Sequence, residues 1–299
     1  MCQAIMKKFP QIEHEEATGE LKETYDDIEA TLRVPWVAFA CRVMSAFPSF
    51  LPRAFCVAKP HHSTRHAERA ADSIRRNAVL PNRGLCDPRP QLKALGWSDG
   101  KIKELILALD AFNYGNPKYL LLITGWSEAI QGRNPSGKSL SGEDAMLIPR
   151  GLPAGVPTLH HMVDENAATA EVLGLYQRVK DIHYHHGPSS DYRLLANYPD
   201  YLSIALNEAI APVARTPEYD AKQRDLIAEA REWVHNLSGP VGISAETLLK
   251  TCKPHEIAGL TGLLFMYQRF IADITIDIIR LKQAFDGDVA AGTSPFPIE

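Results

Sequence analysis

Asp191 is the acidic residue whose surroundings point most directly to chemistry. It lies in Gly187-Pro-Ser-Ser-Asp-Tyr-Arg193, and a related segment earlier in the chain, Trp36 to Arg42, has Ala40 at the matching position. A polar residue that only one copy of a duplicated segment carries is a candidate for an active site. The structural alternative is that Asp after Pro-Ser-Ser supplies a favourable negative charge at a helix N-terminus.

Asn116 is a second polar residue that only one copy of a repeated segment carries. Phe112-Asn-Tyr-Gly-Asn-Pro-Lys-Tyr119 is predicted to interrupt a helix, whereas the matching stretch from Tyr267 to Ile278 continues unbroken with Ile271 opposite Asn116. A duplicated scaffold needs its active groups only once, so a polar residue gained on one side is a candidate for an active site. The alternative is that Asn before Pro marks a turn.

A phosphate-loop pattern also occurs, as Gly132-Arg-Asn-Pro-Ser-Gly137-Lys138-Ser139. Such a loop must join a strand to a helix so that backbone N–H groups point at phosphates. Here a helical pattern precedes the motif, and further Pro and Gly residues follow it. A linker is therefore favoured over nucleotide hydrolysis that uses Lys138.

The histidines form two clusters: His61, His62 and His66, and then His183, His185 and His186. An i, i+4 pair on a helix could hold a metal if a third ligand came from elsewhere. No third ligand can be identified, so we expect solvated or capping histidines and no metal site. A nucleophilic Ser or Cys in a G-x-S-x-G context is not found either, so a triad hydrolase has no support.

The elements that must position these groups form an internal repeat. Tyr25 recurs as Tyr176, 151 positions later, and the same offset relates a longer set of matches: Ala17-Thr18-x-Glu20 with Ala168-Thr169-x-Glu171, Arg42 with Arg193, and Pro48 with Pro199. A second match, at an offset of 155, aligns Ile102 with Ile257. We expect one helical unit, duplicated and divergent: repeat 1 over residues 1–131, a Gly/Pro-rich linker over 132–158, and repeat 2 over 159–299.

The apolar periodicity along both halves is helical. Leu21, Tyr25, Ile28 and Leu32 form a stripe at helical spacing, and comparable spacing occurs over residues 67–74, 102–112, 225–233 and 257–281. No convincing alternating strand pattern lies between turn signals. The sequence predicts an all-α fold in which two pseudo-twofold-related bundles enclose one pocket.

The composition is that of an ordinary globular protein. The 299 residues include 32 Lys and Arg against 36 Asp and Glu, so the net charge is −4, which argues against a nucleic-acid partner. The five cysteines are odd in number and form no C-x-x-C pair, which indicates reduced thiols, most of them in the core. No signal peptide or membrane-length apolar run is recognised, so we expect a cytoplasmic protein without a membrane partner.

Three motifs resemble those of the group I 2-haloacid dehalogenases, which are cofactor-free, all-α enzymes that act on 2-haloalkanoic acids. They are Val34-Pro-Trp-Val-Ala-Phe39, Phe112-Asn-Tyr-Gly-Asn-Pro-Lys-Tyr119 and Ser189-Ser-Asp-Tyr-Arg193. The resemblance covers nearly the whole chain and includes the internal duplication. Long motifs at the correct separations make it far more specific than the phosphate-loop pattern.

The resemblance implies roles by position. Asp191 matches the general base that deprotonates a water, and Asn116 matches the residue that holds and orients this water. Thr64 and Glu68 match a supporting polar pair, for which a surface hydrogen bond is the alternative. The implied walls around the halogen and substrate are Trp36, Ala38, Phe39, Tyr119, Ser189 and Ser190.

The implied reaction is hydrolytic dehalogenation by direct attack of the activated water on the α-carbon, with inversion. A covalent ester at Asp191 and a non-catalytic helical binding protein stay open as alternatives. Burial should raise the pKa of Asp191 and the helix N-terminus should lower it, and the sequence does not decide between them. Backbone N–H groups at that helix start could bind the substrate carboxylate. Ser189 is close in size to the Ala found in family members that accept both substrate enantiomers, so it favours acceptance of both. The resemblance also implies a homodimer without a cofactor.

Overall fold

The regular elements of the protein are helices, as predicted. The computed structural model describes residues 11–133, 140–237 and 239–298. Within those ranges no strand forms, and only an isolated bridge joins Thr64 to Leu147. The all-α class is therefore confirmed, and none of the helices described is long and apolar enough to cross a bilayer.

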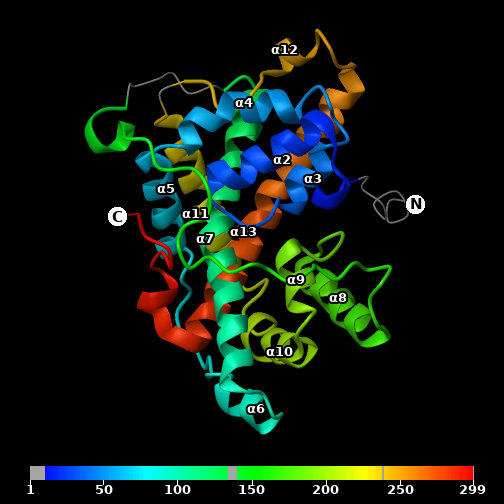
Figure 1. The fold of residues 1–299 in the computed structure, drawn as a ribbon, viewed down its shortest axis with the longest axis vertical. Coiled ribbons are helices and arrows are strands. Elements are labelled where there is room, and N and C mark those ends of the chain that lie inside the picture. The colour runs from blue at the N-terminus through cyan, green and yellow to red at the C-terminus, as the bar shows by residue number, and fades with distance from the viewer. Residues whose placement is uncertain (1–10, 134–139, 238, 299) are drawn as a thin grey trace.

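Two long helices, α7 (Asp99–Ile130) and α13 (Pro254–Ala291), pack against each other through the centre of the molecule (Figure 1). The residues of α7 from Ala111 to Ile130 are all buried, and so are those of α13 from Phe270 to Gln283. A helix that is buried all round belongs in a core. Any polar side chain on these stretches is therefore held in an environment that excludes water.

The remaining helices surround this central pair. The N-terminal ones are η1 (His14–Glu16), α2 (Gly19–Leu32), α3 (Phe39–Met44), α4 (Leu51–His62), α5 (Arg65–Asn77), α6 (Arg89–Ala94) and η2 (Gly142–Ala145). The C-terminal ones are α8 (Ala170–His183), α9 (Ser190–Leu195), α10 (Pro199–Ile204), η3 (Ala205–Ile210), α11 (Pro217–His235) and α12 (Ala245–Leu248). Figure 1 shows α2 to α5 around the upper part of α7, and α8 to α10 together at its lower right.

The predicted interruption of the helix at Phe112 to Tyr119 is wrong, because α7 runs through it unbroken. Pro117 has no N–H, so the carbonyl of Asn113, four residues earlier, loses its helical partner. Arg75 of α5 replaces that partner: its Nε donates to Asn113 O (3.1 Å), and its Nη2 donates to Tyr114 O (3.2 Å). The buried guanidinium thus allows a proline in the middle of a core helix.

Other expectations have mixed outcomes. All five helical patterns predicted from spacing lie in helices, and Pro199 begins α10 while Pro48 lies in the gap between α3 and α4. The prediction that most cysteines are core residues is wrong for the described ones, because only Cys41 is buried, although all four are free thiols. Most of the phosphate-loop pattern, including Lys138, lies outside the described residues.

Two tyrosines make equivalent contacts in the two halves. Tyr25 Oη donates to Ile12 O (3.1 Å), and Tyr176 Oη donates to Val163 O (2.8 Å). Both the donors and the acceptors are 151 positions apart, the offset of the predicted repeat. The contacts support the duplicated unit, and its division at residues 132–158 stays a prediction.

Candidate active site

An enclosed cavity lies between segments from both halves of the chain. It holds about 10 Å³ of free space, which is room for about one water. All eight residues predicted for the catalytic pair and the pocket wall line it: Trp36, Ala38, Phe39, Asn116, Tyr119, Ser189, Ser190 and Asp191. Segments far apart in sequence therefore converge on one site.

Asp191 and Asn116 line this cavity side by side and are in direct contact. Ser189 caps α9 by accepting a hydrogen bond from the Tyr192 N–H (3.4 Å), which places Asp191 in the first turn. Asn116 projects from the buried part of α7, and its Nδ2 donates to Asp191 Oδ1 at 2.7 Å. The carboxylate is only 2% exposed, so this amide is a direct partner in an environment that excludes solvent.

The pKa of Asp191 is raised to about 7, and burial is the largest cause. Hydrogen bonds from Asn116, from the residue's own N–H and from the Ser189 side chain lower it, while the negative charge of Asp277 raises it further. Burial therefore outweighs the helix N-terminus, which answers the question that the sequence left open. A carboxylate with a pKa near neutrality can accept a proton from water more readily than an ordinary one.

The apolar wall of the cavity is fixed by close packing around Trp36. Its ring meets Phe112 edge-on at 4.6 Å between centroids, and its carbonyl accepts a hydrogen bond from Tyr119 Oη. Gly115 makes this position possible, because a Cβ there would lie 2.3 Å from the indole Cη2 and 2.8 Å from Val34 Cγ1. The glycine of the Asn-Tyr-Gly-Asn motif is thus needed for the indole to reach the pocket.

The cavity is also lined by four residues that the sequence did not predict: Ala40, Phe270, Ile271 and Ile274. For two of them the repeat carried a signal. Ala40 is the counterpart of Asp191 and Ile271 is the counterpart of Asn116, so repeat-related positions face one pocket. The sequence indicated only the polar member of each pair, whereas the apolar member lines the same pocket.

The structure does not bring Thr64 and Glu68 into the cavity. Thr64 caps α5 by accepting a hydrogen bond from Ala67 N (3.3 Å). Glu68 is buried rather than on the surface, and its carboxylate accepts hydrogen bonds from Lys118 Nζ and from Tyr114 Oη. Since Lys118 follows Asn116 by two residues on α7, this ion pair can act on the site only by holding that helix.

The prediction of solvated histidines is wrong for several members of the two clusters. His62, His66 and His183 are buried. Burial lowers the pKa of His183, but the Asp277 carboxylate 2.8 Å away holds it above its usual value. His185 lies 3.0 Å from Asp273, and the ligand atoms of His183, His185 and Asp273 lie within 4.8 Å of one another, close enough to bind one metal ion.

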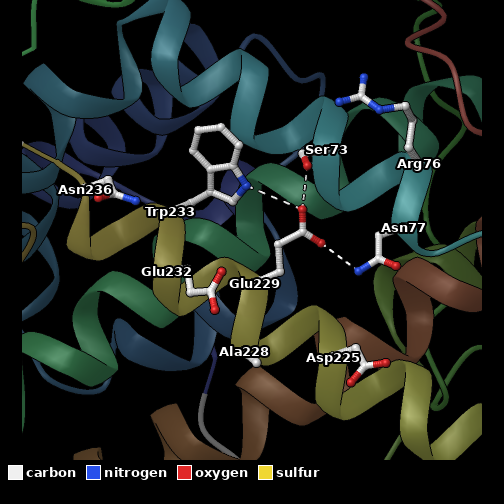
Figure 2. Close-up of a pocket in the computed structure, with 9 residues that line it drawn as sticks. All are labelled: Ser73, Arg76, Asn77, Asp225, Ala228, Glu229, Glu232, Trp233 and Asn236. Atoms are coloured by element: carbon white, nitrogen blue, oxygen red, sulfur yellow. Dashed lines mark hydrogen bonds between the residues drawn. The ribbon is translucent and has the colours of Figure 1, made fainter.

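A wide surface hollow of about 790 Å³ lies elsewhere, between α5 and α11 (Figure 2). Glu229 is its central group and accepts hydrogen bonds from Ser73, Asn77 and the Trp233 indole. None of the predicted site residues lines it. The larger hollow is therefore distinct from the enclosed pocket that holds the candidate chemistry.

Comparison with known proteins agrees with the motifs. The chain is 50% identical over 290 residues to a configuration-inverting 2-haloacid dehalogenase of Alcaligenes xylosoxydans xylosoxydans, covering 97% of this chain and 98% of that one. It is 47% identical to a configuration-inverting 2-haloacid dehalogenase of Pseudomonas sp. (strain 113), covering 98% and 96%, and 28% identical to an (R)-2-haloacid dehalogenase of Pseudomonas putida, covering 95% and 94%. No family model matches the chain.

Solved structures show the same arrangement of helices. A complex of D-2-haloacid dehalogenase with L-LA superposes with a TM-score of 0.85 at 26% identity, covering 92% of this chain and 95% of that one. A D-2-haloacid dehalogenase mutant superposes with a TM-score of 0.84 at the same identity and coverage. The chain holds a buried Asp–Asn pair in an apolar pocket, and it shares close to half of its residues with two configuration-inverting 2-haloacid dehalogenases along nearly its whole length. It therefore belongs to the configuration-inverting 2-haloacid dehalogenases, which are hydrolases that act on carbon–halide bonds.

Proposed function

We propose that this protein hydrolyses short 2-haloalkanoic acids to 2-hydroxyalkanoic acids by direct attack of an Asp191-activated water on the α-carbon. The observation that carries the proposal is the 2.7 Å contact between Asn116 Nδ2 and Asp191 Oδ1 in an enclosed, largely apolar cavity. The amide uses one N–H for the carboxylate, which leaves its second N–H and its carbonyl oxygen for a water. That water would lie within reach of a base whose pKa is near neutrality.

The bond changes balance without a cofactor. The water oxygen forms a bond to the α-carbon on the face opposite the halogen, the carbon–halogen bond breaks, and the halide leaves with the bonding electrons. Asp191 takes the proton of the water and releases it to solvent after the turnover. Backside displacement inverts the α-carbon, and the walls formed by Trp36 and Phe39 keep competing water away from the reacting atoms.

Ser190 is the residue that we assign to the substrate carboxylate. It lines the cavity, it is 3% exposed, and its Oγ makes no hydrogen bond among the described residues. A buried hydroxyl without a partner is unfavourable by about 1–3 kcal/mol unless a ligand supplies one. A hydrogen bond to the substrate carboxylate would satisfy it and would fix the α-carbon relative to Asp191.

We also propose that both enantiomers are accepted, because Ser189 is small and its hydroxyl is engaged in capping α9. The enantiomers exchange the hydrogen and the alkyl group at the α-carbon, so the pocket must have room for the alkyl group on either side. Because the described cysteines are free thiols, we propose a cytoplasmic location. Because of the resemblance, we propose a homodimer. Sedimentation velocity of the purified protein tests the dimer.

Halide release from D- and L-2-chloropropionate, assayed separately with the configuration of the lactate product determined, tests the proposal. We expect chloride from both enantiomers and inverted product from each, with Asp191→Asn at least 10³-fold slower. Retained configuration would contradict single displacement at carbon. Full activity of Asp191→Asn, or no chloride from the wild-type protein, would contradict the assigned reaction.

A further inference from the structure

A second, larger cavity adjoins the catalytic pocket. It has a volume of about 270 Å³ and opens to the surface, and its lining includes Trp36, Arg42 and Arg193. The two cavities share Trp36, whose ring is one wall of the catalytic pocket. The catalytic pocket itself has room for about one water in this structure, so it must widen to admit a haloacid, and a site outside it can hold the anion beforehand. The adjoining cavity has space for a molecule of that size.

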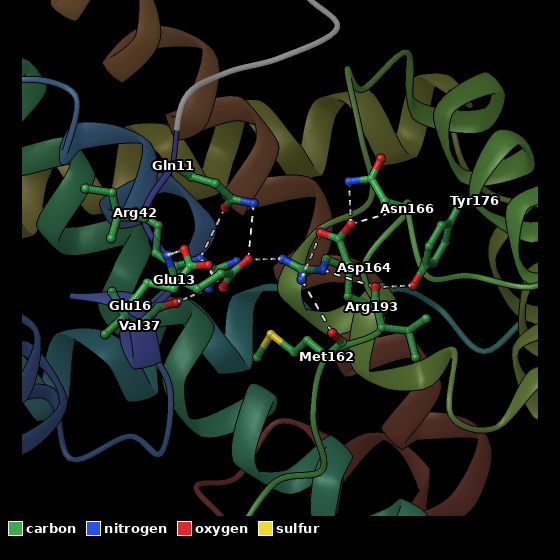
Figure 3. A network of polar contacts seen from close by, with 12 residues as sticks. Gln11, Glu13, Glu16, Val37, Arg42, Met162, Asp164, Asn166, Tyr176 and Arg193 are labelled. Atoms are coloured by element: carbon green, nitrogen blue, oxygen red, sulfur yellow. Dashed lines mark hydrogen bonds and ion pairs between the residues drawn. The ribbon is translucent and has the colours of Figure 1, made fainter.

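Two buried arginines in this cavity share one carboxylate. Arg42 Nε lies 3.2 Å from Glu13 Oε2, and Arg193 Nη1 lies 3.0 Å from Glu13 Oε1. Figure 3 shows Glu13 between the two guanidinium groups. The arginine side chains are only 3% and 6% exposed, and they occupy positions 151 apart, equivalent in the predicted repeat. Each carboxylate oxygen thus faces a different guanidinium, that of Arg193 through a hydrogen bond and that of Arg42 through charge, because Arg42 Nε donates its hydrogen bond to Gln11 Oε1 (3.3 Å).

The Arg42 guanidinium is incompletely paired and lies over the ring of Phe39. Its Nη1 donates to Val37 O at 2.6 Å, but its Nη2, also buried, makes no hydrogen bond among the described residues. Its Cζ stands 5.7 Å from the centre of the Phe39 ring, a wall of the catalytic pocket. Arginine stays charged even where burial lowers its pKa, so Nη2 is a charged donor without an acceptor.

Glu13 lies at the solvent edge of this cavity. Its side chain is 29% exposed, so rotation into solvent would release both arginines, and it would also break the hydrogen bonds that the carboxylate accepts from Gln11 Nε2 (3.2 Å) and from the Glu16 N–H of the capping box. Other acidic groups lie near the cavity. Glu29 lies 3.4 Å from His14, and burial raises its pKa to about 6. Asp164 lies 3.6 Å from Arg193 and is a second acidic partner of that arginine, whereas Glu15 forms no ion pair among the described residues. If an incoming carboxylate replaced Glu13, the buried charge would stay the same and neither arginine would be left without a partner.

We propose that Arg42 and Arg193 form a capture site for the carboxylate of the incoming 2-haloacid, and that Glu13 occupies this site as an internal ligand between turnovers. The inference rests on the proposed function, because it takes the substrate to be an anion. A chain of net charge −4 gives such an anion no overall attraction, so local guanidinium groups must hold it. A tethered carboxylate competes at an effective concentration in the millimolar range, which limits how tightly the substrate is captured.

The test compares Glu13→Gln with Glu15→Gln, a control that lines the same cavity and forms no ion pair with either arginine among the described residues. We expect Glu13→Gln to lower KM for 2-chloropropionate and Ki for propionate three- to tenfold, with kcat within twofold of wild type. Glu15→Gln should leave all three values within twofold. Arg42→Met should raise KM at least tenfold. Unchanged KM and Ki in a folded Glu13→Gln protein would overturn the proposal.

A second variant and two further measurements distinguish failure of the capture site from misfolding and from failure of the proposed function. If Glu13→Gln does not fold, Glu13→Asp replaces it, because the shorter carboxylate cannot reach both arginines and should lower KM in the same direction. Tighter inhibition by chloride without tighter inhibition by propionate would overturn the assignment to a carboxylate. If the wild-type protein releases no halide, the proposed function fails, and calorimetric titration with propionate still tests the capture site through the same two variants.

Discussion

Replacing Asn116 by Ala should move the pH dependence of catalysis to more alkaline values. Burial raises the pKa of Asp191 to about 7, and the Asn116 amide opposes that rise by donating a hydrogen bond to the carboxylate at 2.7 Å. A hydrogen bond to a charged group contributes about 1.5–3 kcal/mol. At 1.36 kcal/mol per unit, losing it should raise the pKa of Asp191 by about one to two units.

The sign of the effect follows from the role of the base. Asp191 must be ionised to accept a proton, so kcat/KM of the wild-type enzyme should rise with pH through about 7 and then level off. In Asn116→Ala this rise should be centred at about pH 8–9, and the plateau should be about 10²-fold lower because the water is no longer oriented. The assay is initial-rate halide release between pH 5 and pH 10.

Ile271→Ala is the matched control for this experiment. Ile271 is the repeat counterpart of Asn116, lines the same cavity and gives the carboxylate no hydrogen bond. It should change the rate and leave the midpoint of the pH profile near 7. An unchanged midpoint in Asn116→Ala would show that the amide does not hold down the pKa of Asp191. An equal shift in both variants would show that the shift comes from cavity size and not from the hydrogen bond.

Three further outcomes are expected. The carboxyl of Asp191 has a pKa of about 7 in the folded protein, above its ordinary value of 3.8. The wild-type free energy of unfolding should therefore fall by up to about 4 kcal/mol as pH rises from 4 to 7. Asp191→Asn lacks this carboxyl, so it should melt at a higher temperature than wild type at pH 8 but not at pH 4. Gly115→Ala should reduce kcat/KM at least tenfold by displacing the indole of the pocket wall, whereas Gly125→Ala, on the same helix but against Val241, should leave it within threefold. Glu68→Gln should destabilise the fold by about 3–5 kcal/mol in urea titrations, because it leaves Lys118 as a buried, unpaired charge, and Glu68→Gln with Lys118→Met should recover part of that loss.

The helices and most of the pocket follow from features that act locally or repeat along the chain. The stripe from Leu21 to Leu32 needs only one apolar face to define α2, and the motif positions around Asp191 lie in short, contiguous stretches. The break predicted at Pro117 failed for a reason of tertiary structure. The donors that replace its missing helical hydrogen bond come from Arg75, far away in sequence and itself buried.

The partners of charged side chains were the least predictable feature. The sequence alone allows Glu68 to be a surface residue of its helix. Only the packing of α5 on α7 shows that it pairs with Lys118. His183 similarly becomes part of a buried ion pair because Asp277 lies on α13 behind it. Spacing along one helix describes the face that a residue occupies, but it carries no information on which charge the neighbouring helix places opposite.

The oxygen that reaches the product tests the direct attack of water on the α-carbon. Wild-type enzyme in molar excess over 2-chloropropionate, in water enriched in oxygen-18, would complete a single turnover before mass spectrometry of both the hydroxyacid and the peptide that contains Asp191. We predict that the hydroxyl of the product carries the label and that the Asp191 carboxylate does not. Label in the Asp191 carboxylate together with unlabelled product would mean that the carboxylate itself attacked the carbon, and would contradict the direct-water mechanism.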